Sequence, residues 1–509
     1  MYQQKKQTSS PKININKLNC EKETKIKYQN SLKDLITPME CEECPQNIWE
    51  KTKEAIKTAA LASAGEIERS KQVNRTPDKY ISEMSNQQKQ IRLQLMNITD
   101  IDKRTELKQE RNKINHIISK RALQIRNQEL DTQADEIEDK AETTMMYKAV
   151  RALNRKKMDN PKVQDDDGKL AATPDEILEI ITAFLKDKFQ DPEREEIHPF
   201  QGPAKRLKKE ITPIEVEKSL KRLNNNRAAG GDEIPGELLK HGAKDLSPIL
   251  SNIFNDVFGT HQPLDINNGQ MITLPKPGKP KGPKKNLRPV TVLDGIRKSL
   301  SLITLDRIRP KVESYLSHSQ SGFRPARSTS DIVWAHRWLA AKVNKSRMDI
   351  NITGIDMSAA FDTVDRHKLL DILKNIIDED ELRIIRFLLS NTTINIKING
   401  ATKQMPFNSN VGVPQGDGLS PVLFTVYLEA ALREVRKDLS QESKIPNEMA
   451  YADDVDFVTI EDHINIDEVQ RKLSEYNLLV NSDKTEYTKL NRKENKSEEV
   501  WRKTKKWDH

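Results

Sequence analysis

The spacing of hydrophobic positions changes along this chain. Between about residues 48 and 153, apolar side chains are scattered among Lys, Glu, Gln, Arg and Ala. Segments 87–96 and 106–129 of this stretch predict long, solvated helices that could form a hairpin. Apolar residues then recur at helical spacing after Thr173-Pro174 and again after Thr212-Pro213. Both pairs favour a helix start, because Thr caps the first turn and Pro suits its first position.

After about residue 205 the pattern becomes mixed. Strand-like and helix-like segments alternate to about residue 490, with Gly and Pro between them. This alternation predicts an α+β unit over 205–490 that holds the main core. Residues 1–44 are polar and lysine-rich and are predicted to be disordered. Residues 45–204 are interpreted as a helical linker region, and 491–509 as a short C-terminal tail.

Composition narrows the class of protein. The chain has 509 residues, 32% charged and 5% aromatic, with a formal net charge of +8. This balance fits a nucleic-acid partner but does not require one. Three cysteines (Cys20, Cys41 and Cys44) argue against a disulfide framework and for a reducing compartment. No apolar run approaches 18 residues and the N-terminus is polar, so we expect an intracellular protein with neither a membrane span nor a secretory signal.

The tetrapeptide Tyr451-Ala452-Asp453-Asp454 lies between β-prone residues. It predicts strand, tight turn and strand, with two adjacent carboxylates at the turn. Such carboxylates repel each other unless a cation lies beside them, and Mg²⁺ prefers oxygen ligands. The pattern indicates phosphoryl transfer, although Asp is also common in ordinary hairpin turns.

A third carboxylate, Asp356, ends the β-prone segment 351–357. It could complete a three-carboxylate site of the kind used in two-metal phosphoryl or nucleotidyl transfer. Asp362 is a further candidate. We favour a structural turn or helix-capping role for it, because neighbouring side chains on a strand-to-helix turn point in different directions.

Two loops carry further candidate chemistry. Residues 411–421 are punctuated by glycine and open a helix over 421–437, with Ser420 as its expected cap. They are either a surface under a flat ligand, which glycine lets approach closely, or an ordinary loop-to-helix junction. Residues 274–290 are strongly basic and proline-rich, and Lys276 and Arg288 are the cations best placed to grip phosphates.

Taken together, these segments resemble the reverse-transcriptase domain of non-LTR (LINE-type) retrotransposons. The resemblance begins near Ile211 and runs to about Leu490. It rests on motifs that occur in the family's order, at residues 226–235, 274–292, 319–329, 356–362, 412–421, 451–454 and 481–486.

The resemblance implies a right-hand polymerase with fingers and palm, an N-terminal helical extension, and RNA-directed DNA synthesis. Its partners would be an RNA template, a DNA primer and a dNTP, in a ribonucleoprotein of the nucleus or cytoplasm. Asp356, Asp453 and Asp454 would hold two Mg²⁺ ions, with Mn²⁺ as the substitute. Lys484 would donate a proton to pyrophosphate.

The remaining implied roles concern nucleotide and nucleic acid. Phe361 would exclude the 2′-hydroxyl of a ribonucleotide. The nucleotide would also contact the following residues: Gln415, Gly416, Lys276 and Arg288. Arg324 and Arg327 would bind the template strand or brace the fingers, and Tyr451 would lie near the primer terminus.

The sequence also departs from the family. A helical thumb normally follows the palm, whereas only 491–509 remain here, and we recognise no endonuclease upstream. The alternative interpretation is therefore a truncated, inactive or recruited nucleic-acid-binding relic. An RNA-templated RNA polymerase is disfavoured by Phe361, since ribonucleotide polymerases need a small or polar group at that position.

Overall fold

The computed structural model describes residues 13–37, 44–67, 78–97, 101–138, 160–346, 348–438, 448–460 and 464–491. The chain divides into two compact units. One comprises Met1–Lys12 and Glu66–Asp159, and the other Ile13–Gly65 and Asn160–His509. Each is described by itself below.

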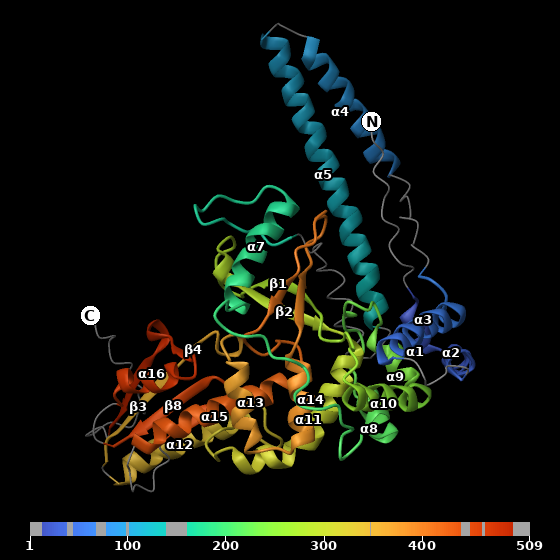
Figure 1. The fold of residues 1–509 in the computed structure, drawn as a ribbon. Helices are drawn as coiled ribbons and strands as arrows, with labels where there is room; N and C mark the ends of the chain where they lie inside the picture. The colour runs from blue at the N-terminus through green and yellow to red at the C-terminus, as the bar shows by residue number, and fades with distance from the viewer. Residues whose placement is uncertain are drawn as a thin grey trace. The chain divides into compact units, whose positions relative to one another are not determined.

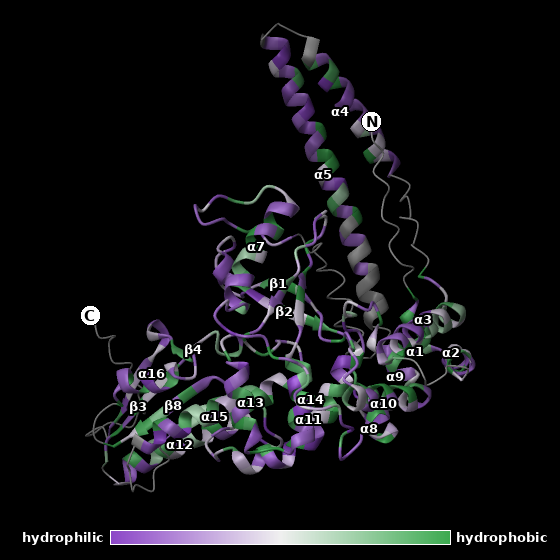
Figure 2. Cartoon of the chain, in the orientation of Figure 1, coloured by the Kyte–Doolittle hydropathy of each residue, from purple (hydrophilic) through white to green (hydrophobic). Residues whose placement is uncertain are grey.

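The first unit contains two long helices, α4 (Lys79–Asn97) and α5 (Ile101–Glu138), which lie side by side (Figure 1). Ile91 and Ile114 are buried, and Arg121 pairs with Asp78 at 3.0 Å. Most other described side chains of the pair are hydrophilic (Figure 2). The predicted long, solvated helices are confirmed.

The second unit begins with three helices, α1 (Ile15–Cys20), α2 (Lys22–Ile36) and α3 (Pro45–Ala64). Leu18, Tyr28 and Leu32 are buried in the main hydrophobic core, and the Tyr28 hydroxyl donates to the Leu238 carbonyl at 3.0 Å. The predicted disorder of 1–44 is therefore wrong for residues 13–37; 1–12 and 38–43 lie outside the described residues. Apolar side chains four residues apart give α2 a buried stripe, which the lysine-rich composition concealed.

Both predicted helix starts are confirmed. In α7 (Pro174–Phe189), the Glu176 amide donates to the Thr173 hydroxyl. In α8 (Pro213–Lys221), Thr212 and Glu215 form a reciprocal capping box. Two further helices, α9 (Gly236–His241) and α10 (Ala243–Thr260), follow.

One four-stranded sheet has the order β2-β1-β5-β6. It comprises β1 (Gly269–Pro275), β2 (Leu287–Leu293), β5 (Thr392–Ile396) and β6 (Phe407–Ser409). The pairs β1–β2 and β5–β6 are antiparallel, whereas β1–β5 is parallel. The apolar stripe of α7 packs with this sheet in one cluster. The basic segment predicted as an extended loop is thus the tip of the β1–β2 hairpin, with the short helix η1 (Lys284–Asn286) in it.

The other four-stranded sheet is antiparallel throughout, in the order β10-β3-β8-β7. Its strands are β3 (Ile350–Ile355), β7 (Glu448–Tyr451), β8 (Asp454–Thr459) and β10 (Glu486–Leu490). One face packs into the main core with α13 (Arg366–Lys374) and α15 (Ser420–Asp438). The opposite face, through Ile350, Ile352 and Val458, packs against α12 (Thr329–Ser346).

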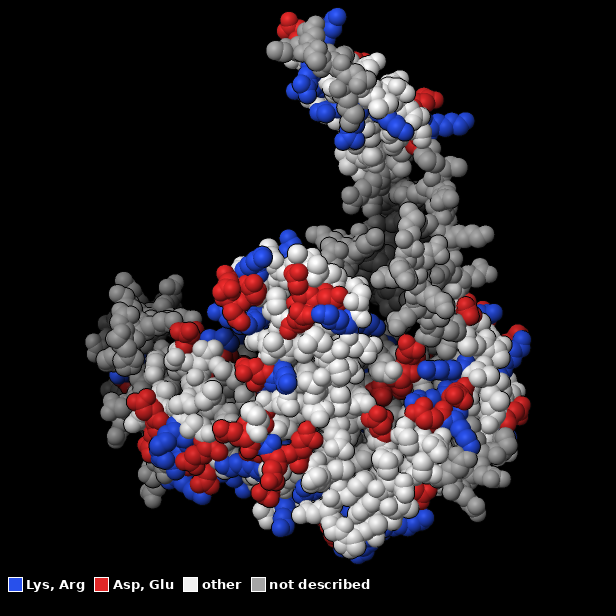
Figure 3. All heavy atoms as spheres, turned by 45° about the horizontal axis from the view of Figure 1, so that its top comes forward, with Lys and Arg blue, Asp and Glu red and all other residues white. Residues whose placement is uncertain are grey.

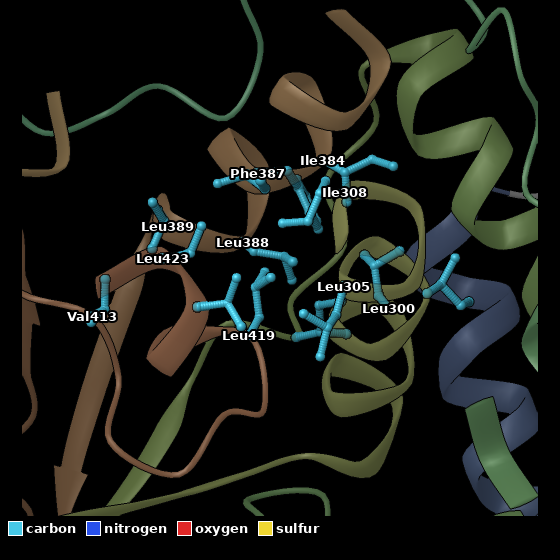
Figure 4. Packing of buried hydrophobic residues seen from close by; sticks show 14 of the residues in the cluster. Leu300, Leu305, Ile308, Ile384, Phe387, Leu388, Leu389, Val413, Leu419 and Leu423 are labelled. Carbon is cyan, nitrogen blue, oxygen red and sulfur yellow. The ribbon is translucent and has the colours of Figure 1, made fainter. Parts of the chain in front are cut away.

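The main core continues between helices. Leucine and isoleucine side chains of α11 (Gly295–Tyr315), α14 (Glu379–Leu389) and α15 interdigitate in Figure 4. Smaller elements complete the unit: α16 (Ile466–Ser474), β4 (Met357–Ser358), β9 (Leu479–Val480), η2 (Ala360–Asp362) and η3 (Ser482–Lys484). Basic and acidic side chains are mixed over the face in Figure 3. The predicted α+β class is confirmed.

Candidate active site

The register of the antiparallel sheet brings the predicted carboxylates together. Ile355 pairs with Val455 across β3 and β8, so the next rung sets Asp356 opposite Asp454. Opposed residues of an antiparallel pair point to the same face, with Cβ atoms about 5 Å apart. Asp453 lies in the tight turn between Tyr451 and Asp454, as predicted.

The three charges repel one another. Burial raises the pKa of Asp453, and the negative charge of Asp356 raises it further. Burial also raises the pKa of Asp454, as do the charges of Asp453 and Asp356. Such a group of carboxylates calls for a cation.

A lysine supplies one positive charge at this point. The Lys484 Nζ lies 2.9 and 2.7 Å from the two Asp356 oxygens. The turn that carries Lys484 is tied to Asp356, because the Asn481 amide donates to the Asp356 carbonyl at 2.8 Å. Among the described residues, no three His, Cys, Asp or Glu side chains are already arranged to hold a metal ion. The donor set nevertheless fits Mg²⁺, because all three side chains offer hard oxygen ligands on one edge of the sheet.

Gln320 clamps the acidic turn. Its Oε1 accepts from the Ala452 amide at 3.1 Å and the Gly322 amide at 2.7 Å, and its Nε2 donates to the Ala452 carbonyl at 3.2 Å. Ala452 has φ of 58°, a left-handed conformation that a non-glycine residue adopts only when its surroundings impose it. A Cβ on Gly322 would lie 2.2 Å from the Ala452 nitrogen. Sequence reasoning missed this clamp, although Gln320 and Gly322 stood in the motif at 319–329.

Phe361 lies among aromatic rings. Its ring stacks on Phe424 with centroids 4.3 Å apart and meets Phe323 edge-on at 6.1 Å. Phe323 is 46% exposed. The Val413 amide donates to the Phe361 carbonyl at 2.9 Å, which joins this segment to the glycine-punctuated loop. The gating role of Phe361 stays a prediction.

Gln415 and Gly416 are pinned to β2. The Thr291 amide donates to the Gln415 carbonyl at 2.9 Å. Gly416 has φ of 129°, and a Cβ on it would lie 2.2 Å from the Thr291 carbonyl oxygen. Only glycine fits this conformation and this contact.

A buried arginine holds the start of the same loop. Arg366 donates to the carbonyls of Gly412, Val411, Ser409 and Leu389. Burial lowers its pKa to about 9. Sequence reasoning gave Arg366 no role, because its carbonyl partners lie more than 20 residues away in the chain.

Asp362 is structural, but it is not the helix cap that we favoured as one of its two roles, because the N-cap of α13 is Asp365. Its carboxylate is buried, accepts from Gln415 Nε2 at 2.7 Å and pairs with Lys188 Nζ at 2.5 Å. It therefore links α7 to the loop that carries Gln415.

Lys188 also belongs to a group of cations. The pKa of Lys276 is lowered by burial and then by the positive charges of Lys188, Arg288 and Lys484. Lys276, one of the two predicted phosphate-binding residues, thus lies within electrostatic reach of the other, Arg288, and of the catalytic candidate Lys484. Lys188 was not predicted, because it lies upstream of every motif in the sequence.

The two arginines of the 319–329 motif differ. Arg324 pairs with Glu313 at 2.9 Å and donates to the carbonyls of Ser317 and Gln320, and its side chain is only 7% exposed. Of its two predicted roles the structure therefore supports bracing, and the prediction that Arg324 binds nucleic acid is not supported. Arg327 is exposed, and its role stays a prediction.

A groove of about 650 Å³ opens on this edge of the sheet. It is lined by Asp356, Asp454, Tyr451 and Lys484, and by residues of α12. Asp456, also in its wall, lies 2.8 Å from His336 Nε2. The groove gives a ligand direct access to the carboxylates.

Comparison with known proteins agrees with this geometry. The family described as reverse transcriptase (RNA-dependent DNA polymerase) matches residues 274–504. The chain is 25% identical over 299 residues to a probable RNA-directed DNA polymerase from transposon X-element of Drosophila melanogaster, covering 56% of this chain and 33% of that protein. It is 28% identical over 202 residues to the Pol polyprotein of the type-1 retrotransposable element R2 of Popillia japonica, covering 38% and 28%.

The chain spans about a third of the length of these relatives. Among solved structures, apo telomerase from Candida tropicalis truncated from its C-terminal domain matches with a TM-score of 0.35 and 14% identity, over 53% of this chain and 66% of that one. None of the described helices has the length and apolarity needed to cross a membrane. The sheet that carries Asp356 corresponds to the palm that the sequence resemblance implies, and the sheet of β1 and β2 to the fingers. Over residues 274–504 the chain therefore resembles the reverse transcriptases of non-LTR retrotransposons.

Proposed function

We propose that this chain is an RNA-directed DNA polymerase, which extends a primer 3′-hydroxyl with dNTPs along an RNA template. The observation that carries the proposal is that Asp356, Asp454 and Lys484 line one groove at the end of the β3–β8 pair, with Asp453 in the adjoining turn. The match to the reverse transcriptase family supports it.

Asp356, Asp453 and Asp454 are the residues that would hold two Mg²⁺ ions, or Mn²⁺ in their place. When bound, such ions lower the pKa of the attacking hydroxyl and neutralise the leaving pyrophosphate. Lys484, whose ammonium lies at Asp356, would give a proton to pyrophosphate as the α-phosphate is transferred. Lys276 and Arg288 would bind the triphosphate, and Gln415 and Gly416 would support the template–nucleotide pair.

Primer extension on poly(rA)/oligo(dT) with Mg²⁺ tests the proposal. We expect dTTP incorporation that falls at least ~10³-fold in Asp453→Asn, since losing ~4 kcal/mol of transition-state stabilisation has that effect. The control is Asp371→Asn, which alters an exposed carboxylate of α13 and should retain activity. Binding of the primer–template without incorporation by the unsubstituted chain would instead support the nucleic-acid-binding relic.

The selection of deoxynucleotides is a separate part of the proposal. Phe361 is fixed by its stack on Phe424, so its ring can form a rigid wall beside the ribose. Phe361→Val should therefore gain incorporation of UTP relative to dTTP. If the ratio of the two rates stays unchanged, Phe361 is not the gate.

A further inference from the structure

The outer face of α12 carries two exposed tryptophans. Trp334 is 67% exposed and Trp338 is 38% exposed, one helical turn further on. Residues four apart lie on the same helix face. Exposed Trp is uncommon on a protein surface unless the surface binds something.

The tryptophans are not needed to pack the fold. The inner face of α12 contributes Leu339 and Val343, both buried against the palm sheet. Trp334 and Trp338 belong to none of the buried clusters of the described residues. Packing of the hydrophobic core therefore does not explain why two tryptophans lie on the solvent side of α12.

The same face is positively charged. At 3.6 residues per turn, Arg337, Lys342 and Lys345 lie on the side of the helix that carries Trp334 and Trp338. The Lys342 Nζ lies 6.0 Å from the Trp338 ring centroid. The acidic residue of this side, Asp331, accepts a hydrogen bond from the Ser328 amide at 2.7 Å. The face thus offers flat apolar rings flanked by cations, a combination suited to nucleic acid.

The helix leads directly away from the catalytic groove. Thr329, Ile332 and Val333 line the groove together with Asp356 and Asp454. Because a helix rises about 1.5 Å per residue, Trp334 and Trp338 lie only ~2 and ~8 Å further along the axis than Val333. The outer face of α12 therefore starts within two helical turns of the groove, a distance that a duplex with its primer end at the aspartates would span.

We propose that the outer face of α12 binds the RNA–DNA duplex as it leaves the active site. Arg337, Lys342 and Lys345 would contact phosphates, and the two Trp rings would pack on sugars and base edges in the wide, shallow groove of an A-form helix. This inference rests on the proposed function, because the duplex is its substrate and product. It assigns a binding surface outside the metal and nucleotide site.

Binding of an RNA–DNA hybrid without dNTP tests the inference. The hybrid carries a fluorescent label, and its anisotropy gives Kd at several salt concentrations. Trp334→Ala/Trp338→Ala should raise Kd at least tenfold, since loss of a ring contact to a base costs ~1–3 kcal/mol. Arg337→Gln/Lys345→Gln should lower the slope of log Kd against log salt by about one to two.

Two controls match these substitutions. Ile214→Ala removes an exposed apolar side chain of α8, which is 77% exposed, and Lys221→Gln removes an exposed cation of the same helix. Both should leave Kd within twofold. Trp338 is the least exposed of the substituted apolar side chains at 38%, so urea unfolding of every variant checks that a change in Kd does not come from a loss of the fold.

The outcomes separate this inference from the proposed function. With hybrid at saturating concentration, the Trp double variant should incorporate a single dTTP at the original rate, because the aspartates are untouched. A chain that binds hybrid through α12 but incorporates nothing would support this surface and refute the polymerase. An unchanged Kd in the Trp double variant would refute duplex binding by the outer face of α12. If that variant also loses an association between copies of this chain that the unsubstituted chain shows, the face is a protein interface.

Discussion

Loss of the Gln320 clamp should lower both the stability of the fold and the rate of catalysis. The perturbation is Gln320→Met, which keeps side-chain volume and flexibility but removes the amide. Gln320 is 2% exposed, so solvent cannot replace its hydrogen bonds. The amides of Ala452 and Gly322 would both lose their acceptor.

The expected loss of stability follows from the two amide donors that are left without an acceptor. Each buried amide left without a partner costs about 1–3 kcal/mol, so the free energy of unfolding should fall by ~2–6 kcal/mol. Ala452 also loses the contacts that hold its left-handed φ of 58°. If the turn relaxes by as little as 1 Å, the displaced Asp453 and Asp454 should lower the rate of chemistry by about 10²-fold.

Two measurements check this expectation. Urea unfolding gives the stability change, and single-turnover primer extension at saturating dNTP and primer–template gives the chemical rate. Ser319→Ala is the control, because it removes a hydrogen bond to Glu448 beside the clamp but none to Ala452. It should lose about 1 kcal/mol and keep its rate. A Gln320→Met chain that is destabilised but extends primers at the original rate would refute the positioning role.

Three further predictions concern other parts of the polymerase unit. Gly416→Ala should raise KM for dNTP and lower the extension rate, because its Cβ would meet the Thr291 carbonyl at 2.2 Å, whereas Gly418→Ala, with its nearest contact at 3.6 Å, should retain both. Arg366→Met should lower the free energy of unfolding by about 4 kcal/mol in urea, because four buried carbonyls lose the hydrogen bond that Arg366 donates; a loss below 1 kcal/mol would show that Arg366 does not hold the loop. Burial and the charge of Asp294 raise the pKa of Asp232 to about 7. The folded chain thus holds a proton that the unfolded chain releases near its ordinary pKa, so stability should fall as pH rises from about 4 to 7. Asp232→Asn should flatten this dependence of the urea midpoint on pH, and an unchanged slope would exclude Asp232 as its source.

The sequence alone determined the elements whose signals are local. Thr173-Pro174 and Thr212-Pro213 were readable as helix starts because a cap acts within one turn of its own helix. Tyr451–Asp454 was readable as a hairpin, because a two-residue turn between β-prone segments is also a local pattern. The order of the motifs was sufficient to identify the family.

Composition was misleading where a buried stripe was narrow. Residues 22–36 look polar in bulk, yet Tyr28, Leu32 and Ile36 recur on one face and enter the core. Burial depends on periodicity and on the surface that receives the stripe, which average composition does not report.

Only the tertiary structure decided which distant groups meet. Gln320 clamps a turn 132 residues away, and Lys188 reaches Asp362 from a helix upstream of the family match. Arg324 stood in a motif that suggested nucleic acid, but its partners Glu313, Ser317 and Gln320 occupy its guanidinium. Whether a polar side chain braces the fold or faces a ligand depends on which hydrogen-bond partners folding brings to it, and these partners are set by packing between elements that no local pattern contains.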